Sequence, residues 1–312
     1  MINKLIKRLY KLGFIKPYYS IDSLRYLKRL SKGRRKSYPY ISERDQEQYR
    51  IDEDILIRSQ SANTHALFLC NPNSHIDRQV ICNGLFASSV LKTVISHTLP
   101  ETCIIDIGAN VGTISIALSL LFPSSDIHAF EPNPYAQKRL RQNLLLNNIN
   151  NLKIHQQALG SSHEYLDFHH YDDVSGDIGL SSFIESKRLP SKAHVKSVEI
   201  KTLDSFEKEF LKPVSVIKID VQGFETEVIK GSHNLIHRHR PVIILEHEDN
   251  NLASKADAER SKQELKALFS AHQYEVFYIT RYNHNLLLPV QWDAPLNGDL
   301  LALPKALDSA AL

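Results

Sequence analysis

The sequence predicts an α/β protein with a mostly parallel sheet, a small inserted β subdomain and a basic N-terminal extension. Three observations predict this class. Strand-like and helix-like patterns alternate from about residue 101 to residue 280. A glycine-containing turn, IDIGANVGTIS at residues 105–115, joins an apolar strand to a helix. One polar stretch, residues 162–202, interrupts the alternation. In repeated strand–helix units each helix returns the chain to the same end of the sheet, so the strands run parallel and the crossovers are right-handed.

Short apolar runs predict the strands of this sheet, because a strand buried on both faces is apolar along its length. The expected strands are residues 103–107, 126–131, 152–157, 214–220, 241–246 and 274–280, with a final hairpin and edge strand from 285–291 and 299–303. Two further strands, 164–169 and 195–202, are expected in the inserted stretch, and a weak pattern within 51–70 suggests an irregular pair.

Apolar residues at helical spacing predict the helices between these strands. Pro123 ends the helix expected at residues 112–122, because proline cannot continue a helix. The expected helices are residues 76–97, 112–122, 133–148, 223–236 and 256–271.

The composition limits the class of protein. The chain has 312 residues, 42% hydrophobic and 23% charged, which suits one large globular domain with a smaller appendage and excludes a disordered chain. Cys70, Cys82 and Cys103 show no metal-binding spacing, which favours a reducing compartment. Without a membrane-spanning run or a secretory signal in the sequence, a cytoplasmic location is expected.

The turn at residues 105–115 predicts a ligand site or, alternatively, a tight turn that binds nothing. Gly108 permits a positive φ angle or the close approach of a ligand, and Gly112 permits close packing. The pattern is neither G-x-G-x-x-G nor a P-loop. Asp106 would repel a pyrophosphate, so a cationic or hydroxyl-rich ligand fits better, and S-adenosyl-L-methionine meets that demand. The candidate cofactor residues here are Asp106, Gly108, Ala109, Asn110 and Gly112.

A second acidic residue supports a nucleoside ligand. Glu131 lies 131 − 108 = 23 residues after Gly108, at the end of the second strand, where nucleoside-binding α/β folds place an acid on the ribose hydroxyls. Pro132 and Asn133 follow it in the same loop. At the end of the third strand, Gln157 and Ala158 are expected to border the adenine ring.

Seven separated motifs occur along the chain in an order that is typical of one protein family. They are DIGANVG, AFEPNP, QALG, LSSF, TLD, IKIDVQGFE and PVIILE, within about residues 76–304. In this order the sequence resembles FkbM-type S-adenosylmethionine-dependent methyltransferases. The resemblance implies the seven-stranded class I methyltransferase (Rossmann-like) sheet, and O-methylation of hydroxyls on sugars, glycans or polyketide-like products. It also implies a glutamate at the position that Gln222 occupies in this chain.

Candidate catalytic residues lie at the ends of the fourth and fifth strands. Asp220 would orient or deprotonate a substrate hydroxyl, or it would bind the methionine amino group or cap the next helix. Glu246 is expected to approach Asp220, and His247 is another candidate base. Two carboxylates there would raise the pKa of one of them, which gives a base, or would hold a divalent cation. No metal site is predicted. An Asn/Asp-Pro-Pro-Tyr/Phe loop does not follow the fourth strand, which disfavours methylation of nucleic-acid bases.

The charge is unevenly distributed. Residues 1–40 contain 12 Lys/Arg and one acidic residue, a balance of +11, whereas the remainder has 26 basic and 34 acidic residues, a balance of −8. The basic arm is either a solvated leader or a contact for an anionic membrane surface, which would make the protein peripheral there. No nucleic-acid partner is expected.

Together these inferences predict an S-adenosylmethionine-dependent methyltransferase that modifies a hydroxylated small molecule or glycan. The alternative is a catalytically inactive module that binds S-adenosylmethionine or a membrane surface. The expected organisation is a basic extension (1–50), a lead-in with a helix covering the cofactor site (51–100), the methyltransferase domain (101–304, with 162–202 inserted) and a tail (305–312).

Overall fold

The computed structural model describes residues 55–58, 65–71, 74–83, 87–171, 178–184, 193–279 and 287–306. They fall into two compact units, one ending before residue 87 and one starting there. The predicted basic extension, and with it the proposed membrane contact of residues 1–40, lies outside the described residues, as does the tail after residue 306. Within the described ranges, no helix has both the length and the apolar content needed to cross a bilayer.

The first unit contains the strand pair that the sequence indicated only weakly. β1 (Ile55–Arg58) pairs antiparallel with β2 (Leu67–Cys70), and α4 (His75–Asn83) packs against β2. The single helix predicted for residues 76–97 is wrong. After α4 a separate helix, α5 (Ser88–His97), begins, and Ala87 before it has a φ angle of 47°, a left-handed conformation that a helix cannot include.

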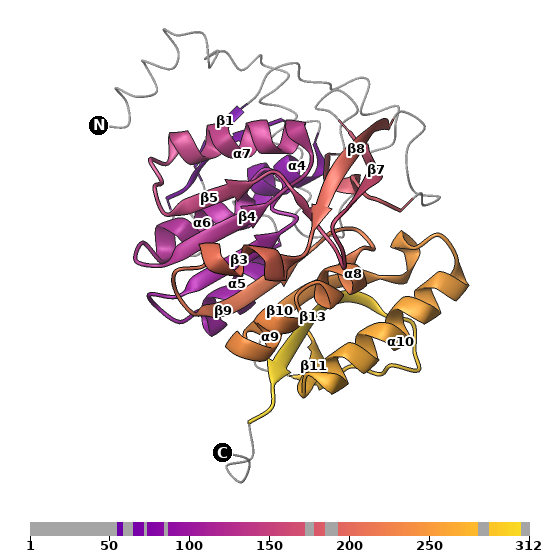
Figure 1. Ribbon diagram of the computed structural model, residues 1–312. Helices are drawn as coiled ribbons and strands as arrows, with labels where there is room; N and C mark the ends of the chain where they lie inside the picture. The colour runs from indigo at the N-terminus through magenta and orange to yellow at the C-terminus, as the bar shows by residue number, and fades with distance from the viewer. Residues whose placement is uncertain are drawn as a thin grey trace, which may run out of the picture. The chain divides into compact units, whose positions relative to one another are not determined.

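The second unit is built on the predicted parallel sheet (Figure 1). This main sheet has eight strands among the described residues, in the order β12-β11-β13-β10-β9-β3-β4-β5. Strands β5, β4, β3, β9 and β10 pair in parallel, whereas β13 runs antiparallel to both of its neighbours. The bounds are β3 (Cys103–Ile107), β4 (Asp126–Phe130), β5 (Leu152–His155), β9 (Val214–Ile219), β10 (Val242–Glu248), β11 (Tyr274–Tyr278), β12 (Leu288–Pro289) and β13 (Asn297–Pro304). The seven-stranded, mostly parallel sheet is thus confirmed, with β12 as a two-residue addition.

Helices cover both faces of this sheet. The larger apolar core joins one face to η4, α8, α9 and α10. On the other face α5 packs against β9 and β10, and α6 packs against β4 and β5. The bounds are α6 (Thr113–Leu121), α7 (Pro134–Leu146), η4 (Leu203–Glu209), α8 (Glu225–Lys230), α9 (His233–His239), η5 (Asp249–Asn251) and α10 (Lys255–Ala271).

The helix predicted for residues 223–236 is in fact two helices, α8 and α9. The break lies at Gly231, where a Cβ atom would meet the carbonyl oxygen of Gly160 at 1.9 Å, so the backbones approach too closely for a side chain. α9 is then capped by Asp204 of the TLD motif, whose carboxylate accepts the backbone N–H groups of Asn234 and Leu235.

The inserted stretch contains both predicted strands, and these form a three-stranded sheet with β6, which lies before the stretch. β8 (His194–Lys201) pairs antiparallel with β7 (Glu164–His170) and parallel with β6 (Ala158–Leu159). The strand predicted for residues 152–157 therefore ends earlier, at His155, because the chain leaves the main sheet to enter the small one. A short turn of helix, η3 (Ile178–Leu180), follows β7.

Candidate active site

The glycine turn lies between the ends of β4 and β9. The N–H groups of Gly108 and Ala109 donate to the carbonyl of Phe130, at 2.9 and 3.1 Å. Gly108 has a φ angle of 74°, and a Cβ atom there would lie 1.8 Å from the carbonyl oxygen of Asp220. At Gly112 a Cβ would meet Leu140 at 2.2 Å, so this glycine lets α6 approach α7 closely. Both glycines are needed by the packing of the turn itself.

Asp106 lies beneath this turn and is fully buried. One of its oxygens accepts the hydroxyl of Ser115, and the other lies 3.2 Å from the ammonium group of Lys218. Lys218 also donates to the carbonyl of Gly108 at 3.1 Å. Lys218 therefore balances the charge of Asp106 inside the protein, and contact of Asp106 with a cofactor stays a prediction. Burial would lower the pKa of Lys218, but the carboxylates of Asp106 and Asp220 raise it above its usual value.

Glu131 is buried at the end of β4 and is held by two backbone donors. The N–H of Asn110 donates to one carboxylate oxygen and the N–H of Asn133 to the other, both at 2.8 Å. Burial raises the pKa of Glu131 to about 7 despite these bonds. Each oxygen retains a lone pair, so the carboxylate is fixed and can still accept hydroxyl groups from a ligand.

The other residues of this loop serve the structure. Pro132 separates Glu131 from Asn133, which caps α7 by accepting the N–H of Tyr135 at 2.9 Å. The side-chain amide of Asn133 donates to the carbonyl of Tyr171 and to the hydroxyl of Ser181. The loop that carries Glu131 is thereby tied to the inserted segment.

The predicted adenine-side residues have different surroundings. Gln157 is half-buried in the connection between β5 and β6. Ala158 is buried in a small apolar cluster with Phe168, Val198 and Ile200 of the inserted sheet. The methyl group of Ala158 therefore packs into that sheet, and contact with a cofactor stays a prediction for both residues.

Asp220 and Glu246 lie side by side at the ends of β9 and β10. The parallel register pairs Leu245 with Ile219, so the next positions along the two strands are Glu246 and Asp220. The amide nitrogen of Gln222 donates to both carboxyl groups, at 2.8 Å to Asp220 and 2.9 Å to Glu246. The negative charge of Asp220 and burial raise the pKa of Glu246 to about 10. Among the described residues, no three acidic, histidine or cysteine side chains gather as a metal site.

His247 does not join this pair. Successive side chains of a strand point to opposite faces, so His247 faces away from Glu246 and its neighbours. It is buried, and its Nε2 atom lies 3.4 Å from Asp249. Burial lowers the pKa of His247 below its usual value. The alternation of β10 thus separates His247 from Glu246, and a catalytic role for His247 stays a prediction.

Several residues that the sequence did not single out complete the site. Lys218 supplies the buried positive charge of the site. The feature of the sequence that could have indicated it is a lysine within the otherwise apolar strand VSVIKI. Glu225 accepts the N–H groups of Val221 and Gly223, and so fixes the loop that carries Gln222. The hydroxyl of Ser182 donates to the carbonyl of Gln222 at 2.8 Å. Since Ser181 contacts Asn133, the LSSF motif links the Glu131 loop to the Asp220 loop.

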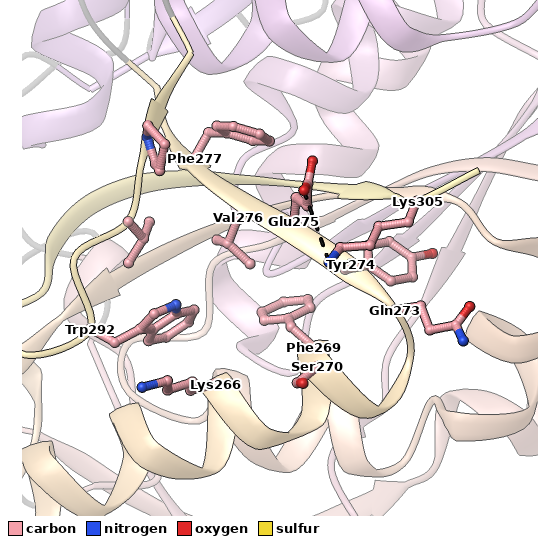
Figure 2. Close-up of a pocket in the computed structure, with 12 residues that line it drawn as sticks. Lys266, Phe269, Ser270, Gln273, Tyr274, Glu275, Val276, Phe277, Trp292 and Lys305 are labelled. Atoms are coloured by element: carbon pink, nitrogen blue, oxygen red, sulfur yellow. Dashed lines mark ion pairs between the residues drawn. The ribbon is translucent and has the colours of Figure 1, made fainter. Parts of the chain in front are cut away.

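A separate groove of about 420 Å³ lies between α10 and β11. Figure 2 shows Trp292 beside Lys266 and Phe269, with Glu275 paired to Lys305 across 3.9 Å. None of the predicted cofactor or catalytic residues lines this groove. The candidate site therefore lies in the loops at the ends of β3, β4, β9 and β10.

Comparison with family models identifies one family, and the relatives found are named as methyltransferases. The model of the methyltransferase FkbM domain matches residues 106–276. The chain is 28% identical over 175 residues to "Methyltransferase 1" of Beauveria bassiana, covering 52% of this chain and 70% of that protein. It is 30% identical over 165 residues to "2-O-methyltransferase NoeI" of Sinorhizobium fredii (49% and 66%). It is also 30% identical over 163 residues to "Hexuronic acid methyltransferase AglP" of Haloferax volcanii (50% and 60%).

Solved structures include methyltransferase FkbM from Methylobacillus flagellatus, which is 12% identical with a TM-score of 0.40 and covers 73% of this chain and 55% of that one. The family model spans more than half of the chain and includes Asp106, Glu131, Asp220 and Glu246. The chain therefore belongs to the FkbM methyltransferase family.

Proposed function

We propose that the protein transfers a methyl group from S-adenosylmethionine to a hydroxyl of a sugar, glycan or related metabolite. The observation that carries the proposal is the arrangement of carboxyl groups on both sides of the glycine turn. Glu131 lies on one side of the turn, and Asp220 with Glu246 lies on the other. A nucleoside site and a hydroxyl-binding site would thus be adjacent.

The residues around the turn fit this methyl donor. Its ribose offers two hydroxyl groups to the fixed carboxylate of Glu131. Lys218 is already shared between Asp106 and Asp220, so its ammonium group is poorly suited to a phosphate. A ligand with ammonium and sulfonium charges and without phosphate matches these acidic surroundings.

In the proposed reaction Asp220 accepts a hydrogen bond from the acceptor hydroxyl and takes up its proton. The side chain of Asp220 is 24% exposed, whereas that of Lys218 behind it is 8% exposed, so Asp220 is the more accessible group of this ion pair. When bound, S-adenosylmethionine supplies an electrophilic methyl group, and the acceptor oxygen forms a bond to it as the methyl–sulfur bond breaks. The protein contributes alignment of the two reactants and a base at the attacking oxygen.

One relative supports transfer to oxygen, and another supports a saccharide acceptor. NoeI is named as a 2-O-methyltransferase and AglP as a hexuronic acid methyltransferase, each at 30% identity to this chain. A saccharide hydroxyl is a weak acid, which explains why a carboxylate beside it would be useful.

The binding half of the proposal is tested by calorimetry with S-adenosylmethionine. We expect wild-type protein to bind, and Glu131→Gln to bind about 10-fold to 100-fold more weakly, since a hydrogen bond to a charged group contributes about 1.5–3 kcal/mol. Glu259→Gln on the surface of α10 is the matched control and should bind like the wild type. No binding by the wild-type protein would refute the proposal.

The transfer half is tested with a radiolabelled methyl donor and a panel of neutral, amino and acidic saccharides. We expect label in an ether-linked methyl group, and a loss of about 100-fold or more in rate for Asp220→Asn, since general-base help typically gives that factor. Donor binding without transfer to any member of the panel would favour the inactive cofactor-binding module instead.

A further inference from the structure

Gln222 lies at the centre of a hydrogen-bonded row that it forms with Asp220 and Glu246. Its side-chain nitrogen is 2.8 Å from an oxygen of Asp220 and 2.9 Å from an oxygen of Glu246. An amide nitrogen has two N–H donors and cannot accept, so one hydrogen is directed to each carboxyl group. The amide therefore joins the two carboxyl groups, which the pairing of β9 and β10 places side by side.

The orientation of this amide is fixed from several sides. Asn251 of η5 donates its side-chain N–H to the amide oxygen of Gln222 at 3.2 Å. The backbone carbonyl of Gln222 accepts the hydroxyl of Ser182 at 2.8 Å. Gln222 has a φ angle of 54°, a left-handed conformation that costs free energy for a residue with a Cβ atom. The surrounding contacts hold the residue in this conformation.

One lysine and several acidic groups of the described residues lie around the row. The ammonium group of Lys218 on β9 is 3.7 Å from Asp220 and 3.2 Å from Asp106 of β3. Acidic groups among the described residues also act within this region: Glu248 on β10 and Asp299 on β13 act on Glu246, and Asp220 acts on Glu225 of α8. Because Lys218 is shared between Asp106 and Asp220, two neighbouring carboxyl groups beside it cannot both ionise without a large electrostatic cost.

We propose that Gln222 is a positioning residue that holds the carboxyl groups of Asp220 and Glu246 side by side with one proton between them, an inference that rests on the proposed methyl transfer. Lys218 lies beside Asp220, so Asp220 is the ionised member and Glu246 the protonated one. The acceptor hydroxyl then meets one ionised oxygen at a fixed position. The raised pKa of Glu246, about 10, agrees with this assignment.

A glutamate in place of Gln222 would change the number of protons that the row holds. Gln222→Glu replaces two N–H donors by a third carboxyl group, so the row must take up a second proton at neutral pH. The test uses full-length protein with ¹³C-labelled glutamate carboxyl groups, followed by NMR over a range of pH. The resonance of Glu246 is assigned by its loss in Glu246→Gln.

We expect the carboxyl resonance of Glu246 to be at its protonated position at pH 7 in the wild type. In Gln222→Glu one additional glutamate resonance should also be at the protonated position. The matched control is Gln263→Glu, where an exposed amide on α10 that also contacts a carboxylate, Glu259, receives the same change. The added resonance of this control should be ionised at pH 7.

Two results would overturn the proposal. The first is a Glu246 that is ionised at pH 7 in the wild type. The second is an introduced carboxyl group that is as fully ionised in Gln222→Glu as it is in Gln263→Glu. If Gln222 had only a structural role, Gln222→Glu would change the stability of the protein and leave the titration of the carboxyl groups unchanged.

A second measurement needs only wild-type protein and covers the case in which Gln222→Glu does not fold. The side-chain amide hydrogens of Gln222 should exchange with solvent at least about 10-fold more slowly than those of Gln263, because both hydrogens of Gln222 are held in hydrogen bonds to partly buried carboxyl groups. Equal exchange rates would also overturn the proposal.

These titrations are measured without donor or acceptor. They can succeed when no methyl transfer is found, and they can fail when transfer is active, so the fate of this inference is distinguishable from that of the proposed function.

Discussion

The ammonium group of Lys218 lies 3.2 Å from the carboxylate of Asp106, and both side chains are buried. The two residues are direct neighbours on adjacent parallel strands, since the register of β3 and β9 pairs Asp106 with Lys218. The carboxylate also accepts the hydroxyl of Ser115, and the ammonium group also donates to Gly108. This ion pair therefore supports the turn from below and connects it to the strand that carries Asp220.

Lys218→Met should destabilise the protein by about 3–5 kcal/mol, because it leaves the buried charge of Asp106 without its partner. Urea unfolding at neutral pH measures the loss. The matched control is Lys212→Met, since the pair of Lys212 with Asp126 is about one third exposed. Breaking that pair should cost about 0–1 kcal/mol. Equal losses in the two variants would contradict the assignment of Lys218 as a buried counter-ion.

Gly108→Ala should be less stable than Gly298→Ala, although both glycines have a positive φ angle. Each substitution strains the backbone, at a cost of about 1–3 kcal/mol. Only at Gly108 would the new Cβ meet another atom, the carbonyl oxygen of Asp220, whereas no atom lies within 4 Å at Gly298. Overpacking should add at least about 1–3 kcal/mol at Gly108, measured by thermal and urea unfolding. A smaller loss at Gly108 than at Gly298 would show that β3 and β9 do not approach so closely.

Glu225→Gln should reduce the decline in stability between pH 5 and pH 8. Burial raises the pKa of Glu225 from 4.5 to about 7. The folded state therefore holds this proton more tightly than the unfolded state, and the stabilisation, present below pH 4.5, is lost as pH rises through 7. The shift corresponds to about 3 kcal/mol. Glutamine keeps an oxygen for the N–H groups of Val221 and Gly223 but does not titrate.

Urea midpoints at several pH values measure this slope. Glu259→Gln on the surface of α10 should leave it unchanged. A slope in Glu225→Gln identical to that of the wild type would mean that Glu225 is ionised in the folded protein at pH 5.

A pair of buried histidines should make the protein sensitive to acid. Nδ1 of His128 lies 2.9 Å from Nε2 of His155, and the ring of His155 stacks on Phe130. Burial lowers the pKa of each histidine to about 4. A histidine with a lowered pKa contributes stability above pH 6.5, and this contribution is lost as pH falls through 4.

His155→Phe should weaken the acid-induced loss of stability between pH 6.5 and pH 4, by up to about 3 kcal/mol for one histidine. Urea midpoints across this pH range measure the effect. His163→Phe is the control, because that side chain is 65% exposed. If His155→Phe loses stability on acidification as steeply as the wild type, the pair is not kept neutral by burial.

The sequence predicted most of the fold because its main signals are local. Apolar runs of five to seven residues marked β3, β4, β9 and β10, and proline or glycine marked several ends. The failures have local physical causes. Ala87 and Gly231 divide predicted helices, the first through its left-handed backbone and the second through contact with Gly160. Neither feature is visible in apolar spacing.

The site was predictable only in part. The end of each strand in a parallel sheet lies at a common edge, so the sequence by itself determined that Glu131, Asp220 and Glu246 belong to one region of the protein. It also determined the family, because separated motifs along one chain carry that information without coordinates.

Tertiary structure alone decided which of these groups meet. Asp106 and Lys218 are 218 − 106 = 112 residues apart, and only the register of β3 and β9 makes them an ion pair. Glu246 and His247 are adjacent in sequence, yet the pleat of β10 directs them to opposite faces, so only Glu246 joins Asp220. Gln222 reads as a departure from a motif, and its role as a bridge depends on the spacing of two strands. Local chemistry is encoded residue by residue, whereas charge balance and proton sharing depend on distances that only the folded chain sets.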